Sequence, residues 1–247
     1  MNKAPESYAK KAIKAPDRIR SMFNVVSGRY DLMNRLMTVG MDQRWRKIAA
    51  KSTDADSSSV VLDACTGTGD FALAVNSVTG AKVIGVDFSK DMLDLAREKA
   101  ANTNTSANED ISFIEASVVN LPFSDNEFSA VTIGFGLRNT PDYRAVLREF
   151  LRVTKPGGKL VCLETSQPEY RILRSPARWF TSSLFPFIAR IISNDYHAYR
   201  YLSDSMEVFP PQEELAQMMK EAGWAEVKYR NFFAGMVALH VATKGGK

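Results

Sequence analysis

The sequence has few of the residues that build metal centres and disulfide frameworks. It contains two cysteines and two histidines, with no CxxC motif and no histidine–cysteine cluster. This predicts that the chain binds no metal and that Cys65 and Cys162 are reduced, buried thiols. The sequence also shows no apolar run of membrane-spanning length and no apolar secretory segment at its start. These absences predict a cytoplasmic protein.

An excess of charge of one sign is also lacking. There are 32 basic and 28 acidic residues, which gives a net charge of +4. The cations are dispersed and no aromatic-and-basic RNA-binding signature is present, so we expect no nucleic-acid partner. The mild basic excess is compatible with an anionic surface such as a membrane. A hydrophobic content of 45% and a charged content of 24% are ordinary for one soluble domain with decorations.

The segment VLDACTGTGD, Val61–Asp70, is the most informative part of the chain. It indicates an apolar strand, a glycine turn and the start of a helix. Gly67 and Gly69 carry no Cβ, so the backbone can turn tightly and approach a ligand closely. A second apolar strand ends at Asp87, where a carboxylate can accept two hydrogen bonds from a ribose diol. The pattern predicts a cofactor that contains adenosine.

Two details favour S-adenosylmethionine (SAM) over a nicotinamide cofactor. Asp63 lies inside the first predicted strand, where its carboxylate could receive the amino group of a methionine moiety, directly or through the loop. The motif also follows a helical block rather than opening the fold. A nicotinamide site stays an alternative, because Ala72 fits the third position of the dinucleotide fingerprint. A turn that needs glycine only for packing is a second alternative.

Predicted strands and helices alternate after a helical block at 1–51 and a polar linker at Ser52–Ser59. This alternation is typical of parallel βαβ units. The last two predicted strands, Val227–Phe233 and Met236–Thr243, are separated by about two residues, which requires an antiparallel hairpin. We predict an α/β fold of the class I SAM-dependent methyltransferase type, a Rossmann-like, seven-stranded, mostly parallel sheet with a C-terminal antiparallel hairpin. Residues 1–51 would form a helical lid and 52–247 the methyltransferase domain.

An aromatic segment at about 167–208 interrupts the alternation and predicts a helical insertion. One interpretation is a lid whose apolar residues are simply core. The other is an apolar cavity for a hydrophobic substrate, or a surface that touches a bilayer. Tyr196, Tyr199 and Tyr201 are its candidate substrate-binding residues.

Several longer strings resemble the ubiquinone/menaquinone-biosynthesis C-methyltransferase family. They are FGLRNTPDY from Phe135, YDLMNRLMTVGMDQRWRK from Tyr30, LPFSDNEF from Leu121 and KPGGKLVCLETSQP from Lys155. The resemblance extends over about Met22–Lys244. It implies SAM-dependent C-methylation of a prenylated hydroquinone, with demethylmenaquinol converted to menaquinol and S-adenosylhomocysteine released. A lipid-tailed quinol further implies transient contact with the inner face of a membrane, and a homodimer is one assembly to consider.

Other functions stay open at this point. The acceptor could be the benzoquinol precursor of ubiquinone or another small molecule, and the chain could be a non-catalytic scaffold of a quinone-biosynthesis complex. The predicted cofactor-binding residues are Asp63, Gly67, Thr68, Gly69, Asp87, Phe88, Ser117, Val118 and Gly134. Some family members have serine at the position of Gly134, so a contact there would come from the backbone. The Ser117–Val118 pair is often Asn-Ala or Asp-Ala in the family.

Carbon methylation needs a group that favours an ionised quinol and a group that accepts the ring proton. Arg138 follows an apolar strand and could stabilise the phenolate or polarise a water, with a structural salt bridge as its alternative role. Asn139 could orient the ring hydroxyl or hold the loop. Tyr30 and Asn34 share a helix face and could close over SAM. His240 is a candidate proton acceptor, or a satisfied core histidine.

Overall fold

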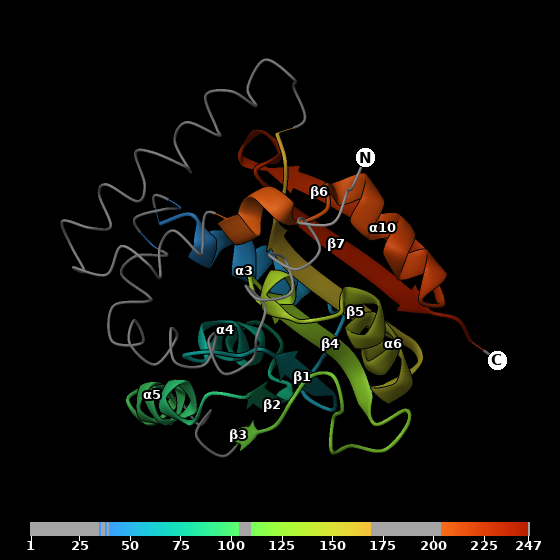
Figure 1. The fold of residues 1–247 in the computed structure, drawn as a ribbon. Helices are drawn as coiled ribbons and strands as arrows, with labels where there is room; N and C mark the ends of the chain where they lie inside the picture. Colours follow the sequence, from blue (N-terminus) through green and yellow to red (C-terminus); the bar gives the residue numbers. More distant parts are fainter. Residues whose placement is uncertain (1–34, 36–37, 39, 104–109, 169–203, 247) are drawn as a thin grey trace, which may run out of the picture.

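The computed structural model describes residues 35, 38, 40–103, 110–168 and 204–246. Its seven strands form one sheet in the order β3-β2-β1-β4-β5-β7-β6 (Figure 1). The strands are β1 Val60–Ala64, β2 Lys82–Asp87, β3 Ile111–Glu115, β4 Phe128–Gly134, β5 Thr154–Thr165, β6 Trp224–Phe232 and β7 Val237–Lys244. β7 pairs antiparallel with both β5 and β6, and the other pairs are parallel. The predicted fold class is confirmed.

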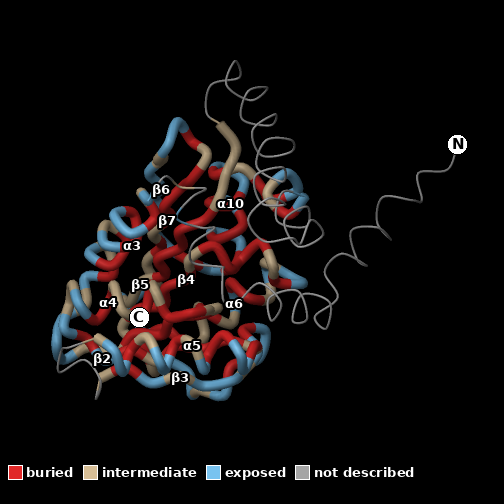
Figure 2. Tube along the Cα trace, turned by 90° about the vertical axis from the view of Figure 1, so that its left-hand side faces the viewer, coloured by how far each residue is buried: buried red, intermediate tan, exposed pale blue. Residues whose placement is uncertain are grey.

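Helices cover both faces of this sheet (Figure 1). They are α3 Asp42–Lys51, α4 Asp70–Thr79, α5 Lys90–Ala101, α6 Tyr143–Val153 and α10 Gln212–Glu221, with short 3₁₀ turns η2 Leu137–Asn139 and η4 Phe233–Gly235. One apolar cluster joins the strands to α6 and α10, and a second joins them to α3 and α4. Figure 2 shows the buried residues concentrated along the strands between these layers.

Local sequence signals explain where the helices begin. The side chain of Ser89 accepts a hydrogen bond from the amide of Met92 at the start of α5. Asp142 does the same for Ala145 at the start of α6. Such caps satisfy amides that the first helical turn leaves unpaired. Serine and aspartate are preferred N-cap residues, so both caps could be predicted from the sequence.

The sequence predicts that a strand begins at Lys159, after a turn at Pro156–Gly158, and this start is wrong. The strand begins at Thr154, directly after α6, and Thr154 already pairs with Phe128 of β4. The register then shifts before Lys159 pairs with Ala130, so the Pro-Gly-Gly segment lies in an irregularity of the sheet instead of a separate turn. A β-bulge of this kind absorbs extra residues without ending the pairing.

The last part of the predicted lid belongs to the core. In α3, Trp45, Ala49 and Ala50 are buried in the apolar cluster that also holds Phe71 and Val75 of α4. Cys65 and Cys162 are free thiols, half-buried and buried respectively. Within the described residues, no helix has the length and apolar character needed to cross a membrane.

Candidate active site

The parallel strands bring the two predicted motifs to one edge of the sheet. The glycine turn follows β1, and Asp87 ends β2, the neighbour of β1 on one side. The segment Phe135–Asn139 follows β4, the neighbour of β1 on the other side. Ligands of open α/β sheets bind where the strand order reverses in this way.

Asp87 is held by the backbone of the glycine turn. The amide of Gly67 donates to its Oδ2 at 2.9 Å, and the amide of Ser89 donates to its Oδ1 at 3.0 Å. Burial raises the pKa of Asp87 above its usual value, although these backbone hydrogen bonds partly oppose the shift. Each carboxylate oxygen can accept more than one hydrogen bond. Asp87 therefore combines a fixed position with the acceptor capacity that a ribose diol needs.

The two glycines of the turn differ in what they allow. Gly67 has a φ of 55°, and among the described residues no atom beyond its own chain neighbours lies within 4 Å of the place where its Cβ would stand. Gly69 has a φ of 82°, and a Cβ there would meet Ala96 at 3.1 Å and the ring of Phe113 at 3.2 Å. Gly69 is thus required for packing, as one sequence interpretation stated. Gly67 leaves open space beside its backbone, as a cofactor cradle requires.

Asp63 contacts the glycine turn through a hydrogen bond from Thr66. It is fully buried, and its two oxygens accept hydrogen bonds from Thr66 Oγ1 at 2.6 Å and Thr132 Oγ1 at 2.7 Å. Burial raises its pKa to about 6 against the effect of these hydrogen bonds. Of the two routes predicted to the methionine amino group, this geometry favours the one through the loop.

The remaining predicted cofactor residues surround the same turn. Lys99 Nζ donates to Thr68 Oγ1 at 3.1 Å and to Asp70 Oδ1 at 2.5 Å, which fixes the hydroxyl of Thr68. Beyond β2 and β3, Phe88 is half-buried, Ser117 is exposed and Val118 is buried. A Cβ on Gly134 would meet the ring of Phe71 at 2.9 Å. The absence of a side chain at Gly134 is therefore a packing requirement.

The segment after β4 is backbone-strained and tightly packed. Phe135 has a φ of 56° and Cys65, at the end of β1, a φ of 51°. A Cβ on Gly136 would lie 2.5 Å from the Cβ of Cys65. The ring of Phe135 lies between two guanidinium groups, 5.7 Å from Arg46 and 5.9 Å from Arg138. Strain of this kind gathers at functional sites. The close approach of Gly136 to Cys65 packs the segment after β4 against the segment after β1.

Arg138 forms a buried ion pair with a residue that sequence reasoning missed. Its Nη1 lies 2.5 Å from Oε1 of Glu164 on β5, and its backbone amide donates to Oε2 at 3.3 Å. The side chains are 2% and 1% exposed. Asn139 follows, half-buried, with its amide donating to Gly136. An acidic residue inside the apolar string LVCLET was the available signal for Glu164.

His240 lies on β7, opposite Cys162 of β5. Its Nε2 is 2.8 Å from the carbonyl oxygen of Gln212. A carbonyl can only accept, so Nε2 carries the proton and Nδ1 is the unprotonated nitrogen. Within the part of the chain that the structure describes, Nδ1 is buried and has no hydrogen-bond partner. Burial lowers the pKa of His240 to about 4, so the ring is neutral at pH 7.

The other predicted site residues lie outside the described residues. They are Tyr30, Asn34, Tyr196, Tyr199 and Tyr201. The structure places Arg138, Asn139 and the cofactor residues around the ends of β1, β2, β3 and β4. It places His240 two strands away from β4. The side chain of His240 lies on the same face of the sheet as that of Cys162, the residue opposite it on β5.

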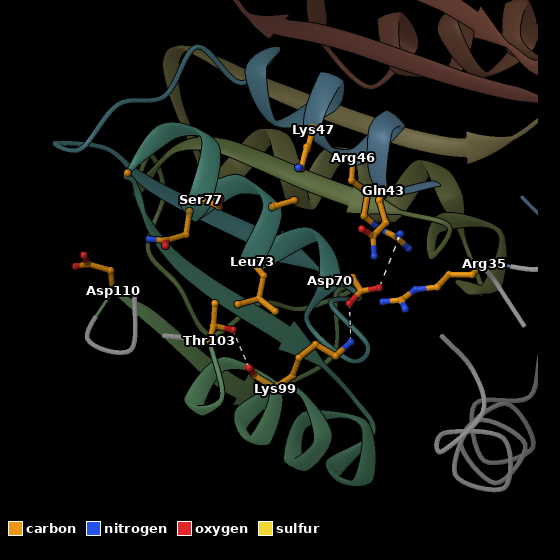
Figure 3. A pocket seen from close by; sticks show the side chains of 13 residues that line it. Arg35, Gln43, Arg46, Lys47, Asp70, Leu73, Ser77, Lys99, Thr103 and Asp110 are labelled. Carbon is orange, nitrogen blue, oxygen red and sulfur yellow. Dashed lines mark hydrogen bonds and ion pairs between the residues drawn. The ribbon is translucent and has the colours of Figure 1, made fainter. Parts of the chain in front are cut away.

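A cavity of about 540 Å³ lies beside this strand edge. Figure 3 shows it along the outer side of α4, between α3 and α5. Its walls include Arg46 and Lys47 of α3, Asp70 and Leu73 of α4, and Lys99 of α5. Asp70 and Lys99 belong to the hydrogen-bonded group that holds Thr68. The cavity therefore adjoins the glycine turn and extends along α4 as far as Gly80.

Comparisons with known proteins identify a family for this chain. The model of the ubiE/COQ5 methyltransferase family matches residues 11–244. A protein of Shouchella clausii named demethylmenaquinone methyltransferase is 38% identical over 92% of this chain and 96% of its own length. One of Staphylococcus saprophyticus with the same name is 38% identical over 92% and 97%.

Solved structures share the fold at low sequence identity. A SAM-dependent methyltransferase of Thermotoga maritima has a TM-score of 0.62 at 18% identity, covering 92% of this chain and 99% of that one. The [4+2]-cyclase SpnF has a TM-score of 0.68 at 18% identity, covering 93% and 96%. A cyclase among these neighbours shows that the fold alone does not determine the reaction.

Proposed function

The chain belongs to the ubiE/COQ5 methyltransferase family, and we propose that it transfers the methyl group of SAM to a ring carbon of demethylmenaquinol, a lipid-tailed hydroquinone. The names of its relatives support this acceptor over the benzoquinol. The observation that carries the proposal is that two groups of residues lie at the same edge of the sheet. The glycine turn with Asp87 lies on one side of β1, and the Arg138–Glu164 pair lies on the other.

The residues after β1 and β2 fit SAM. The open space at Gly67 leaves room for a close approach to the backbone, and Asp87 has acceptor capacity for a ribose diol. Thr68, Phe88, Ser117 and Val118 complete the group that would hold the cofactor. When bound, SAM supplies an electrophilic methyl group on a sulfonium, so the protein must mainly align the acceptor carbon.

Arg138 is the residue that favours the ionised quinol. A ring carbon attacks well when the neighbouring hydroxyl has lost its proton, and a fixed guanidinium stabilises the resulting oxyanion. Glu164 holds Arg138 by contacts to both its side chain and its backbone amide. Because this pair is buried and pre-positioned, Arg138 needs little reorganisation when the quinol ionises. Asn139, next along the chain, is proposed to orient the same hydroxyl.

The ring proton has two candidate acceptors. One is a water polarised by Arg138, and the other is Nδ1 of His240. Arginine is itself a poor base because it stays protonated. The pKa of about 4 makes His240 a weak base, since an efficient base has a pKa near the working pH. The water route is therefore the favoured one.

The direct test is transfer of labelled methyl from SAM to a reduced, short-tailed demethylmenaquinol, with the matching benzoquinol precursor in parallel. We expect labelled product from the naphthoquinol and none from the benzoquinol. Arg138→Lys keeps the charge but loses the planar fork, so it should retain SAM binding while transfer falls. SAM binding without transfer to either quinol would contradict the proposal.

A further inference from the structure

The turn between β6 and β7 is entirely apolar. Residues Phe232–Met236 read FFAGM, and Phe233 is 44% exposed. Turn tips ordinarily use Asn, Asp or Gly, which tolerate both water and a positive φ. Here Phe233 and Ala234 have φ values of 48° and 54°. An aromatic ring held in water on a strained backbone indicates a surface selected for contact.

This turn lies at the same edge of the sheet as the candidate active site, on the outermost strand. β6 runs in the same direction as β1–β5, because both β5 and β6 are antiparallel to β7. The β6–β7 turn is therefore at the same edge of the sheet as the ends of β1 and β4, which the glycine turn and Arg138 follow. Met236 accepts a hydrogen bond at 2.8 Å from the amide of Ser166, directly after β5.

Arg230 and helix α3 adjoin the apolar turn. Trp45 of α3 stacks on Phe232 with ring centroids 5.9 Å apart and lies 6.4 Å from Phe233. The guanidinium of Arg230 lies 5.2 Å from the ring of Phe232. The exposed residues of α3 are Gln43, Arg44, Lys47 and Lys51. The one acidic residue of this helix, Asp42, is buried and paired with Arg46, so its exposed face is purely cationic or neutral.

We propose that the β6–β7 turn and the exposed face of α3 together form a docking surface for an anionic lipid bilayer. Phe233 would enter the headgroup layer, and Arg44 and Arg230 would face the anionic headgroups. This edge of the sheet would then face the bilayer. This inference rests on the proposed function, because a lipid-tailed quinol must leave the bilayer to be methylated.

The first test is sedimentation of the full chain with phosphatidylcholine vesicles, with and without phosphatidylglycerol. We expect binding that depends on phosphatidylglycerol and weakens with salt. Phe233→Asn removes the ring while suiting the positive φ, and it should weaken binding about tenfold. The matched control is Tyr229→Asn, on the same strand and 43% exposed, which should bind as the wild type does.

Charge is tested separately. The double variant Arg44→Gln, Arg230→Gln should weaken binding about 25-fold, at about fivefold per cation. Lys228→Gln removes an exposed cation on β6 that lies 3.6 Å from Glu226, and it should leave binding unchanged. Equal binding of Phe233→Asn and wild type, or binding indifferent to phosphatidylglycerol, would overturn the proposal.

Kinetics separate docking from catalysis. Phe233→Asn should keep the wild-type kcat on a water-soluble, short-tailed quinol and raise KM for a long-tailed quinol supplied in vesicles. A change of oligomeric state in light scattering, with vesicle binding intact, would reassign the turn to a protein interface and overturn the proposal. Wild-type chain that binds vesicles but does not methylate the short-tailed quinol would sustain the docking surface and defeat the proposed function.

Discussion

At the ends of β1 and β2, backbone amides hold the carboxylate of Asp87, whereas at the ends of β4 and β5 the carboxylate of Glu164 accepts from two backbone amides and also pairs with a buried guanidinium. The first arrangement is neutral apart from one buried acid, Asp87. The second encloses two full charges. Neutral amides suit a ligand that brings its own hydroxyls, and a preformed charge pair suits a ligand whose charge changes during the reaction.

The buried titratable groups of the two regions also differ. Asp63, beneath the cofactor turn, has its pKa raised to about 6, and His240, on the acceptor side, has its pKa lowered to about 4. Desolvation is the main cause of both shifts, because burial disfavours whichever form is charged. Burial therefore favours the neutral form of both groups. As pH rises, the stability contributed by Asp63 falls and the stability contributed by His240 increases.

The largest expected effect comes from breaking the ion pair on the acceptor side. Glu164→Leu leaves Arg138 buried without this partner and should lower the free energy of unfolding by about 3–5 kcal/mol. The double variant Arg138→Leu, Glu164→Leu removes both charges and should recover much of that loss. Denaturant unfolding measures all three differences. If the double variant were as unstable as Glu164→Leu, the unpaired charge of Arg138 would not be the cause of the lost stability.

The pH dependence of stability separates the two regions next. Asp63 binds its proton more tightly in the folded chain, so its contribution is full below about pH 3.8 and is lost as pH rises through about 6. His240 behaves oppositely: its contribution is present above about pH 6.5 and is lost as pH falls through about 4. Each amounts to about 3 kcal/mol at most.

Two substitutions should reveal these opposing slopes. Asp63→Asn should gain stability relative to wild type as pH rises from 4 to 6, and His240→Asn should lose it over the same interval. Unfolding free energies measured at several pH values give both trends. Variant curves that run parallel to the wild-type curve would mean that neither group titrates differently in the two states.

A smaller effect is expected from the cofactor side. Asp87→Asn keeps the shape of the side chain but replaces an acceptor with a donor, facing the Gly67 and Ser89 amides. SAM affinity should fall about 10- to 100-fold, the range of one or two hydrogen bonds to a charged group. Calorimetric titration gives the Kd. Asp94→Asn, an exposed acid on α5 paired with Lys90, should leave it unchanged.

The smallest effect is expected at the seam between the two regions, which is the contact of Gly136 with Cys65. Gly136→Ala places a methyl group against Cys65 and should cost about 1–3 kcal/mol by overpacking. Because Cys65 follows β1 and Gly136 follows β4, we expect SAM affinity and transfer rate to fall together. Adding Cys65→Gly should restore part of both. A loss of transfer alone would mean that the seam does not connect the two regions.

The cofactor side could be predicted from the sequence because its signals are local. Gly67, Gly69 and Asp87 lie within or directly beside the strands that position them, and Ser89 and Asp142 cap their own helices. The acceptor side could not be predicted to the same depth. Glu164 meets Arg138 across 26 positions, and His240 meets Gln212 across 28. Such pairs depend on tertiary strand order, which periodicity does not encode.

The most direct test of the two-part site is to measure SAM affinity and methyl transfer for the same variant, Arg138→Gln. If cofactor binding and acceptor activation are built on separate strand ends, the Kd for SAM should stay within about threefold of wild type while kcat falls by at least about 100-fold. Calorimetry and single-turnover transfer to the short-tailed naphthoquinol give the two numbers. A Kd that rises as steeply as kcat falls would contradict the division and make Arg138 part of the cofactor site.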